Sequence, residues 1–220
     1  MPRIKARELH PHITWNYYED LRGRITAKDL HSDFTVFNSS GAYYELSVNP
    51  RFQRIETPFR ISKSIPAIPA GAYPWTDIAF KGATDLSRPL ALTFTLTEGQ
   101  FWSGHQHSQQ LGVAVRPSAK FSSTVGISHT AASLAVPHAS FEATLWTMRA
   151  NYSLATNKFV DGLAQYDPHA HLLNANIRFN LIHHPLSDLF VVLNQQRITM
   201  PDAPPSGFGV IVKYTQMLAF

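Results

Sequence analysis

Histidines are the residues of this chain whose spacing first suggests chemistry. Eleven are present, and six of them form pairs separated by two residues: His10 and His12, His105 and His107, His169 and His171. In an extended strand, that spacing places both imidazoles on one face. A catalytic zinc site needs three protein ligands in a dry, shaped pocket, whereas these pairs lie near predicted strand ends or loops. The sequence therefore predicts no metal site and no cofactor.

Nucleophilic catalysis is the second chemistry considered. Ser128 precedes His129, and Ser153 ends the segment Asn151–Ser153, but neither serine lies in a motif for a strained nucleophile turn. The sequence also lacks a glycine-rich phosphate loop. We therefore predict no catalytic residues and a protein that is not an enzyme. A barrel hydrolase stays open as an alternative, and it would require a Ser–His pair within hydrogen-bond reach.

Polar side chains recur at every second position in two segments of the C-terminal half. Each segment alternates these polar residues with apolar ones, as a two-faced strand does. The sequence predicts that the polar residues face the lumen of a barrel, and the alternative is the solvent face of a soluble sheet. The predicted lumen-facing residues are Thr147, Arg149, Asn151, Asn174, Asn176, Arg178 and Asn180.

The stretch 207–220 alternates in the same way and finishes on an aromatic residue. Its apolar face includes Phe208, Tyr214, Leu218 and Phe220. This pattern resembles the C-terminal signature of bacterial outer-membrane proteins, which is read by the barrel-assembly machinery, and in which the last strand closes the barrel. Tyr214, Leu218 and Phe220 are the predicted assembly signature. The alternative is an ordinary edge strand.

Composition agrees with a strand-built membrane protein. Hydrophobic residues make up 44% of the 220 and aromatic residues 12%, but charged residues only 15%, against about 25% in soluble domains. No run of about 18 apolar residues is present, which excludes a transmembrane helix. The chain has no cysteine, and its net charge of +4 comes from scattered residues. Disulfide scaffolds are thereby excluded, and no nucleic-acid partner is predicted.

The remaining sequence predicts about twelve meandering strands that begin near His10. Several of the predicted strands reach about ten residues, which a tilted membrane strand needs. Short connections (38–41, 85–89, 116–119, 155–158, 184–187) alternate with longer ones (49–74, 98–104, 131–138, 195–206). That alternation is typical of outer-membrane barrels, whose periplasmic turns are short. We predict an all-β, antiparallel up-and-down transmembrane β-barrel, or the C-terminal part of a larger one. The proline-rich segment 49–74 is predicted to be an extracellular loop that folds partly into the pore mouth.

Several segments resemble the C-terminal domain of the DUF5916 family. They are Asn16–Tyr18, Glu45–Pro50, Gly71–Trp75, Arg149–Leu154, Leu163–Tyr166, Asn174–Phe179, His184–Val192 and Lys213–Thr215. The resemblance covers most of the chain from about His10, although His184 stands where the family leads us to expect a bulkier or basic residue. It implies an exported protein with a carbohydrate-binding, family 9-like β-sandwich before an outer-membrane barrel.

The N-terminus bears on how the chain is organised. Residues 1–9 lack the apolar segment of a signal peptide. We therefore predict a non-domain segment at 1–9 and a barrel domain at 10–220 that is the C-terminal part of a longer precursor.

The predicted function is a passive pore or surface receptor in a Gram-negative outer membrane. Its predicted partners are outer-membrane lipid, the barrel-assembly machinery and a carbohydrate-type solute. The alternative is a soluble β-sandwich or lipocalin-like binding module. The two differ in whether the apolar strand faces point outward, as a girdle, or inward, to a core or ligand cavity.

Overall fold

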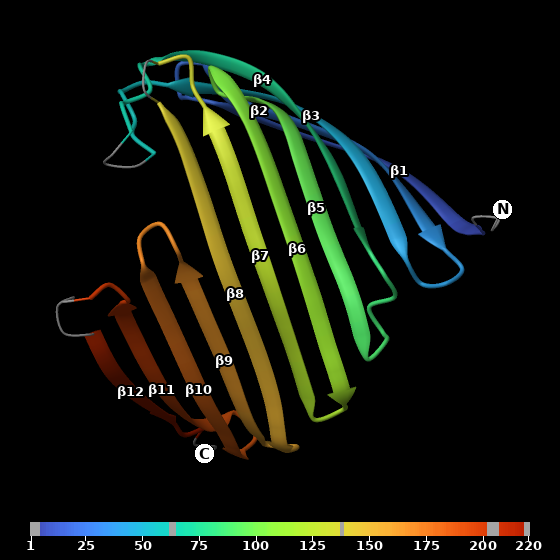
Figure 1. Ribbon diagram of the computed structural model, residues 1–220, viewed down its shortest axis with the longest axis vertical. Helices are drawn as coiled ribbons and strands as arrows, with labels where there is room; N and C mark the ends of the chain where they lie inside the picture. The colour runs from blue at the N-terminus through green and yellow to red at the C-terminus, as the bar shows by residue number, and fades with distance from the viewer. Residues whose placement is uncertain (1–4, 62–64, 137–138, 202–206, 218–220) are drawn as a thin grey trace. The chain divides into compact units, whose positions relative to one another are not determined.

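The computed structural model describes residues 5–61, 65–136, 139–201 and 207–217, and within these ranges it contains twelve strands and no helix (Figure 1). Both the all-β class and the number of strands are confirmed. The strands are β1 (Ala6–Glu19), β2 (Ile25–Asn38), β3 (Tyr43–Ile55), β4 (Gly71–Ala83), β5 (Leu90–Phe101), β6 (Gly104–Ser118), β7 (Phe121–Ser133), β8 (Ser140–Ala155), β9 (Lys158–Asp167), β10 (Leu172–His184), β11 (Ser187–Ile198) and β12 (Gly207–Thr215).

The strands form one antiparallel meander in which each strand is hydrogen-bonded to the next, from β1 through β12 (Figure 1). This up-and-down order agrees with the predicted topology. β1 and β12 are the two ends of the strand order, so the pairing shows the meander but not the closure of a barrel. No helix among the described residues is long and apolar enough to cross a membrane.

Contacts divide the chain into two compact units, which are described separately below. Unit 1 comprises residues 1–87, 93–111 and 129–143, and unit 2 comprises residues 88–92, 112–128 and 144–220.

In unit 1, the usual relation between polarity and burial is reversed. Along β3, the polar residues Glu45, Ser47 and Asn49 are buried, whereas Leu46 and Val48 between them are exposed. The antiparallel register continues both faces onto the neighbouring strands. On the buried face, Ser47 is opposite Asp33 of β2 and Ala79 of β4. On the other face, Leu46 is opposite Phe34 of β2 and Phe80 of β4. The apolar face of this sheet is therefore the more exposed one.

Unit 2 shows the reversal in part. In β8, the side chains of Trp146, Met148, Tyr152 and Leu154 are exposed, whereas Thr147 and Asn151 are partly buried. The apolar face continues onto β12, where four alternating residues are also exposed: Phe208, Val210, Val212 and Tyr214. The polar face of unit 2 is not covered as in unit 1, because Arg149, Arg178 and Lys213 on it are exposed as well.

β3 ends later and β4 begins earlier than the sequence predicts, because the prediction gave proline too much weight. Pro50 lies within β3 at a point where the pairing with β2 is interrupted, between Asp29–Arg51 and Ser32–Val48. Pro74 lies in a part of β4 that precedes its first partner on β5. The N–H group that proline lacks is therefore not needed for a hydrogen bond to β2 at Pro50 or to β5 at Pro74. The predicted loop 49–74 therefore shortens to 56–70, and β1 begins at Ala6 rather than near His10.

Part of the 56–70 connection is packed, at Ile65 and Ile68. Phe59 and Ile68 exchange two backbone hydrogen bonds of 2.7 and 3.0 Å, and Ile65 and Ile68 are buried in a cluster with Ile55, Leu134 and Ala139. This cluster is the main apolar core of unit 1 within the described residues, and it lies at one end of the strands.

The other connections mostly keep the predicted alternation. The connections 119–120, 156–157 and 185–186 are tight turns, and 56–70, 134–139 and 199–206 are longer. The predicted loop 98–104 is wrong, because β5 runs to Phe101 and β6 starts at Gly104. Trp102 makes this turn with a left-handed φ of 54°, and it stacks 5.4 Å from the ring of Trp75. A left-handed tryptophan is uncommon, and the sequence carries no glycine signal at that position.

Candidate functional site

A row of charged and amide side chains crosses β1 to β4 on the polar face of unit 1. We refer to these residues as the charged ladder: His12, His31, Asp33, Asn49, Arg51 and Asp77. All six residues lie on the same face of the sheet. Residues two apart in a strand share a face, and the register places His12 opposite Asp33 and Asn49 opposite Asp77. Regular strand pairing is therefore what assembles the ladder.

Hydrogen bonds and ion pairs link the ladder from end to end. His12 Nδ1 and His31 Nε2 lie 2.9 and 3.0 Å from Asp33 Oδ2. His31 Nδ1 is 2.6 Å from Asn49 Oδ1. The chain continues because Asn49 Nδ2 donates to Asp77 Oδ1 over 2.7 Å, and Arg51 Nε lies 3.0 Å from Asp77 Oδ2.

The two carboxylates of the ladder are almost completely covered. The side chains of Asp33 and Asp77 are only 6% and 4% exposed. A buried carboxylate is costly unless it is paired and hydrogen-bonded, and both of these are. A neighbouring pair, Lys81 Nζ and Glu45 Oε1 at 2.8 Å, adds a third partly buried carboxylate on the same face.

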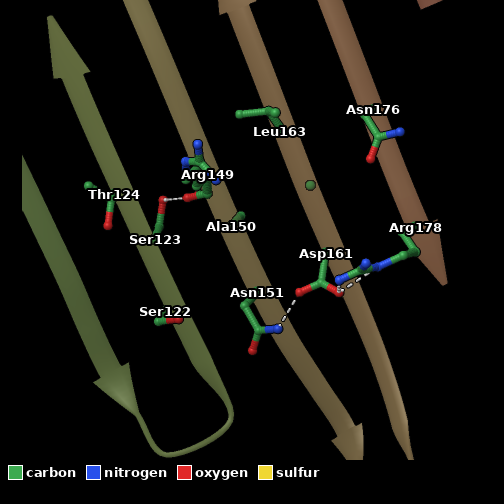
Figure 2. Close-up of a pocket in the computed structure, with 11 residues that line it drawn as sticks. Ser122, Ser123, Thr124, Arg149, Ala150, Asn151, Asp161, Leu163, Asn176 and Arg178 are labelled. Atoms are coloured by element: carbon green, nitrogen blue, oxygen red, sulfur yellow. Dashed lines mark hydrogen bonds and ion pairs between the residues drawn. The ribbon is translucent and has the colours of Figure 1, made fainter. Parts of the chain in front are cut away.

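The polar face of unit 2 contains the residues predicted to face a lumen, of which Figure 2 shows Arg149, Asn151, Asn176 and Arg178. Arg149, Asn151, Asn176 and Arg178 line one open pocket, together with Asp161 and others. Asn174 lines an adjacent pocket, Thr147 is opposite Gln165, and Asn180 is opposite Phe159. Strand register therefore brings the seven residues onto one face, which we call the amide face. Whether that face lines a lumen stays a prediction.

Two of the bonds within the amide face join neutral amides. Asn176 Nδ2 donates to Asn194 Oδ1 over 2.6 Å, and Gln196 Nε2 donates to Asn174 Oδ1 over 3.1 Å. Asp161 is the charged centre: it accepts from Asn151 Nδ2 at 2.6 Å and from Arg178 at 2.8 and 3.2 Å (Figure 2). The side chain of Asp161 is 34% exposed, so water shares in solvating this ion pair.

The predicted assembly signature is described only in part. Tyr214 lies on β12 with its side chain exposed. Its ring stacks on His183 with centroids 5.2 Å apart, and its hydroxyl donates to Gln216 Oε1 over 2.6 Å. Leu218 and Phe220 lie outside the described residues.

His10, His12, His105 and His107 of the histidine pairs have acidic side-chain partners. His10 lies 3.1 Å from Glu8, and both His105 and His107 contact Glu98. His169 lies in the turn 168–171, where its backbone N–H donates to Asp167.

Sequence reasoning missed the charged ladder as a unit. The alternation of Asp29, His31, Asp33 and Thr35 in the sequence already indicates a charged face. What it lacks is the partner of each residue on another strand, since Asp33 is 21 positions from His12 and Asn49 is 18 positions from His31. Arg51 could have been included had the proline at position 50 not been read as a strand end.

Comparison with known proteins returned no match to a protein-family model, to a curated protein or to a solved structure. The resemblance to the DUF5916 family therefore stays a prediction.

Proposed function

We propose that this chain is a transmembrane β-barrel, or part of one, that resides in a bacterial outer membrane and acts as a passive pore. The observation that carries the proposal is an exposed apolar face in both units, opposite a polar face whose residues are buried in unit 1. Outer-membrane strands have this pattern, because one face meets lipid and the other meets a polar lumen.

The exposed apolar face supports a membrane over water as the surroundings of the sheet. Exposed aliphatic and aromatic side chains recur on β1, β3, β5, β8 and β12. Soluble monomers rarely expose contiguous apolar patches larger than a few hundred Å². A soluble sandwich or lipocalin-like module would instead turn these side chains toward a core, so the reversed burial argues against that alternative.

The amide face supports a pore for neutral or weakly charged polar solutes. Asparagine and glutamine side chains both donate and accept hydrogen bonds, so they can replace the hydration of hydroxyl-rich molecules. A carbohydrate-type solute fits this chemistry and also fits the resemblance to the DUF5916 family. A surface receptor with the same polar face is the second form of the proposal.

The experiment is a gel-mobility assay followed by conductance. The full chain is refolded into detergent micelles and run with and without boiling. We expect a faster unboiled band, because closed barrels resist denaturation by the detergent, and we expect stepwise conductance in planar bilayers. A chain that is monodisperse without detergent and shows no mobility shift would contradict the membrane proposal. A shifted band without conductance would leave a barrel that is not a pore and would favour the receptor form.

A further inference from the structure

Three potential metal ligands converge where β1 meets β2. His12 Nδ1 and His31 Nε2 both lie within 3.0 Å of Asp33 Oδ2, and the three ligand atoms lie within 4.8 Å of one another. We propose that His12, His31 and Asp33 bind a divalent transition-metal ion, Zn²⁺ in the first instance. This proposal does not depend on the pore function.

Strand register places the three ligands. His12 is directly opposite Asp33, and Thr14 is directly opposite His31. His31 and Asp33 are two residues apart and share a face, so His12 and His31 form a diagonal pair within reach of long side chains. The site is therefore built on paired strands rather than on loops, which favours a constant geometry.

The orientation of His31 is set by a second row of contacts. Because Asn49 Nδ2 donates to Asp77 Oδ1, Asn49 Oδ1 is the atom that faces His31 Nδ1 at 2.6 Å. An amide oxygen can only accept, so His31 Nδ1 carries the hydrogen, and in the neutral ring Nε2 carries the lone pair. Metal-binding histidines characteristically donate their other N–H to a carbonyl or carboxylate oxygen in this way.

His12 has a comparable arrangement. Its Nδ1 faces Asp33, and the hydroxyl of Thr14 lies 3.0 Å from its Nε2. Asp33 is held in turn, since the Thr35 hydroxyl donates to its Oδ1 over 3.1 Å and leaves Oδ2 for the two imidazoles. Each of the three ligands thus has an outer contact that fixes its direction.

The spacing of the ligand atoms suits a metal ion. In the neutral ring, a lone pair on His31 Nε2 would repel Asp33 Oδ2 at 3.0 Å, and either a metal ion between them or a proton on Nε2 removes that repulsion. Zinc bonds of about 2.0–2.2 Å imply separations of about 2.9–3.5 Å between neighbouring ligand atoms, and the two observed distances, 2.9 and 3.0 Å, lie at the lower end of this range. The side chain of His12 is 58% exposed, so water can complete the coordination.

Two imidazoles and one carboxylate favour zinc, nickel or copper over calcium or magnesium, which prefer oxygen ligands.

β1 is an end of the strand order, and nearly all of its residues are exposed. A metal ion shared by His12 on β1 and two residues on β2 would fasten this strand to the sheet. We therefore assign the site a structural role.

The test is calorimetric titration of the refolded full chain with ZnCl₂, using His12→Ala, His31→Ala and a double variant His105→Ala/His107→Ala. The double variant is the matched control, because it removes another histidine pair that contacts a carboxylate. We expect each single variant to weaken Zn²⁺ binding at least tenfold and the control to bind as the unmodified chain does. No binding by the unmodified chain, which would indicate an imidazolium–carboxylate pair instead, would overturn the proposal, and so would a loss confined to the control.

Two further measurements protect the test against misfolded variants. Copper(II) bound to the unmodified chain should show an electron paramagnetic resonance spectrum with couplings to two imidazole nitrogens; a spectrum without nitrogen couplings would contradict the assignment. Zn²⁺ should also slow hydrogen exchange of β1 amides in the unmodified chain and not in the His12→Ala variant. Equal slowing in both would show that the ion binds elsewhere.

Discussion

The charged ladder of β1–β4 and the amide face of β8–β11 are polar faces of the same sheet, and each lies opposite exposed apolar side chains. They differ in charge and in solvent exposure. The ladder holds two carboxylates whose side chains are 6% and 4% exposed, each satisfied by several partners. Among the described residues, the amide face has one ion pair, at Asp161 and Arg178, and this pair is open to water. Tightly satisfied charges stabilise a single arrangement, whereas open amides leave hydrogen-bonding capacity for a solute. This difference favours a structural role for the ladder, and under the proposed pore function the amide face is the one expected to meet solute.

The largest expected effect concerns the property that the two regions share, their exposed apolar faces. Replacing Leu46 in unit 1 or Ile177 in unit 2 by lysine should destabilise the refolded protein by about 2–4 kcal/mol near the bilayer centre, because a charge would be placed in lipid. Unfolding by urea in lipid vesicles measures this. Asn176→Lys, on the opposite face of β10 from Ile177, is the control and should cost much less. Equal small costs for all three variants would mean that both faces meet water.

The next effect separates the two regions. Asp77→Ala removes the carboxylate that pairs with Asn49 and Arg51 and leaves a buried amide without its acceptor, so we expect a loss of about 1–3 kcal/mol. Asp161→Ala removes a partly exposed ion pair and should cost less than about 1 kcal/mol. Both values come from urea unfolding in micelles. If Asp161→Ala proved the more costly, the division into a structural ladder and an open face would be wrong.

A third change addresses the amide face alone. Arg149→Glu reverses a charge on this face, so it should shift the reversal potential of bilayer currents toward cation selectivity. Folding stability should change by less than about 0.5 kcal/mol, since Arg149 is exposed. Lys120→Glu, in the turn between β6 and β7, makes the same charge change away from the face and should leave selectivity unaltered. A similar shift in both variants would indicate a general charge effect.

The smallest effect concerns a turn that belongs to neither polar region. Asp20 accepts backbone N–H groups from Arg24 and Arg22 at 2.9 and 2.8 Å, and these bonds, that from Arg24 first, hold the pKa of its carboxyl below the ordinary value. Because the folded pKa is the lower one, the stabilisation is complete above the unfolded pKa of about 3.9 and is lost as the pH falls through the folded value.

We expect the protection factors of amides in the turn 20–24, measured by NMR, to fall as the pH falls through the folded pKa of Asp20. The protection factors of the charged ladder should stay unchanged. In Asp20→Asn, the fall in the turn should be absent. Protection factors in the turn that do not change with pH in the unmodified chain would contradict this account.

Much of the fold could be predicted because a strand has a period of two. Alternation alone identified twelve strands, grouped Asn174 with Asn176, Arg178 and Asn180, and placed Tyr214 on an apolar face. These statements concern neighbours in one strand, whose relation follows from backbone geometry. Proline misled the prediction at Pro50 and Pro74, because its cost depends on whether a second strand needs the missing N–H, and the sequence does not contain that information.

Only the tertiary structure decided which face of each strand is covered and which charges meet. Period two divides a strand into two faces but does not say which is buried, so the same pattern suits a soluble sandwich and a membrane sheet. The meeting of His12 with Asp33, and of Asn49 with Asp77, depends on register between strands, which is set by hydrogen bonds across the whole ladder. The packing of the 56–70 connection around Ile65 and Ile68 likewise depends on residues that are far apart in the chain, such as Leu134 and Ala139.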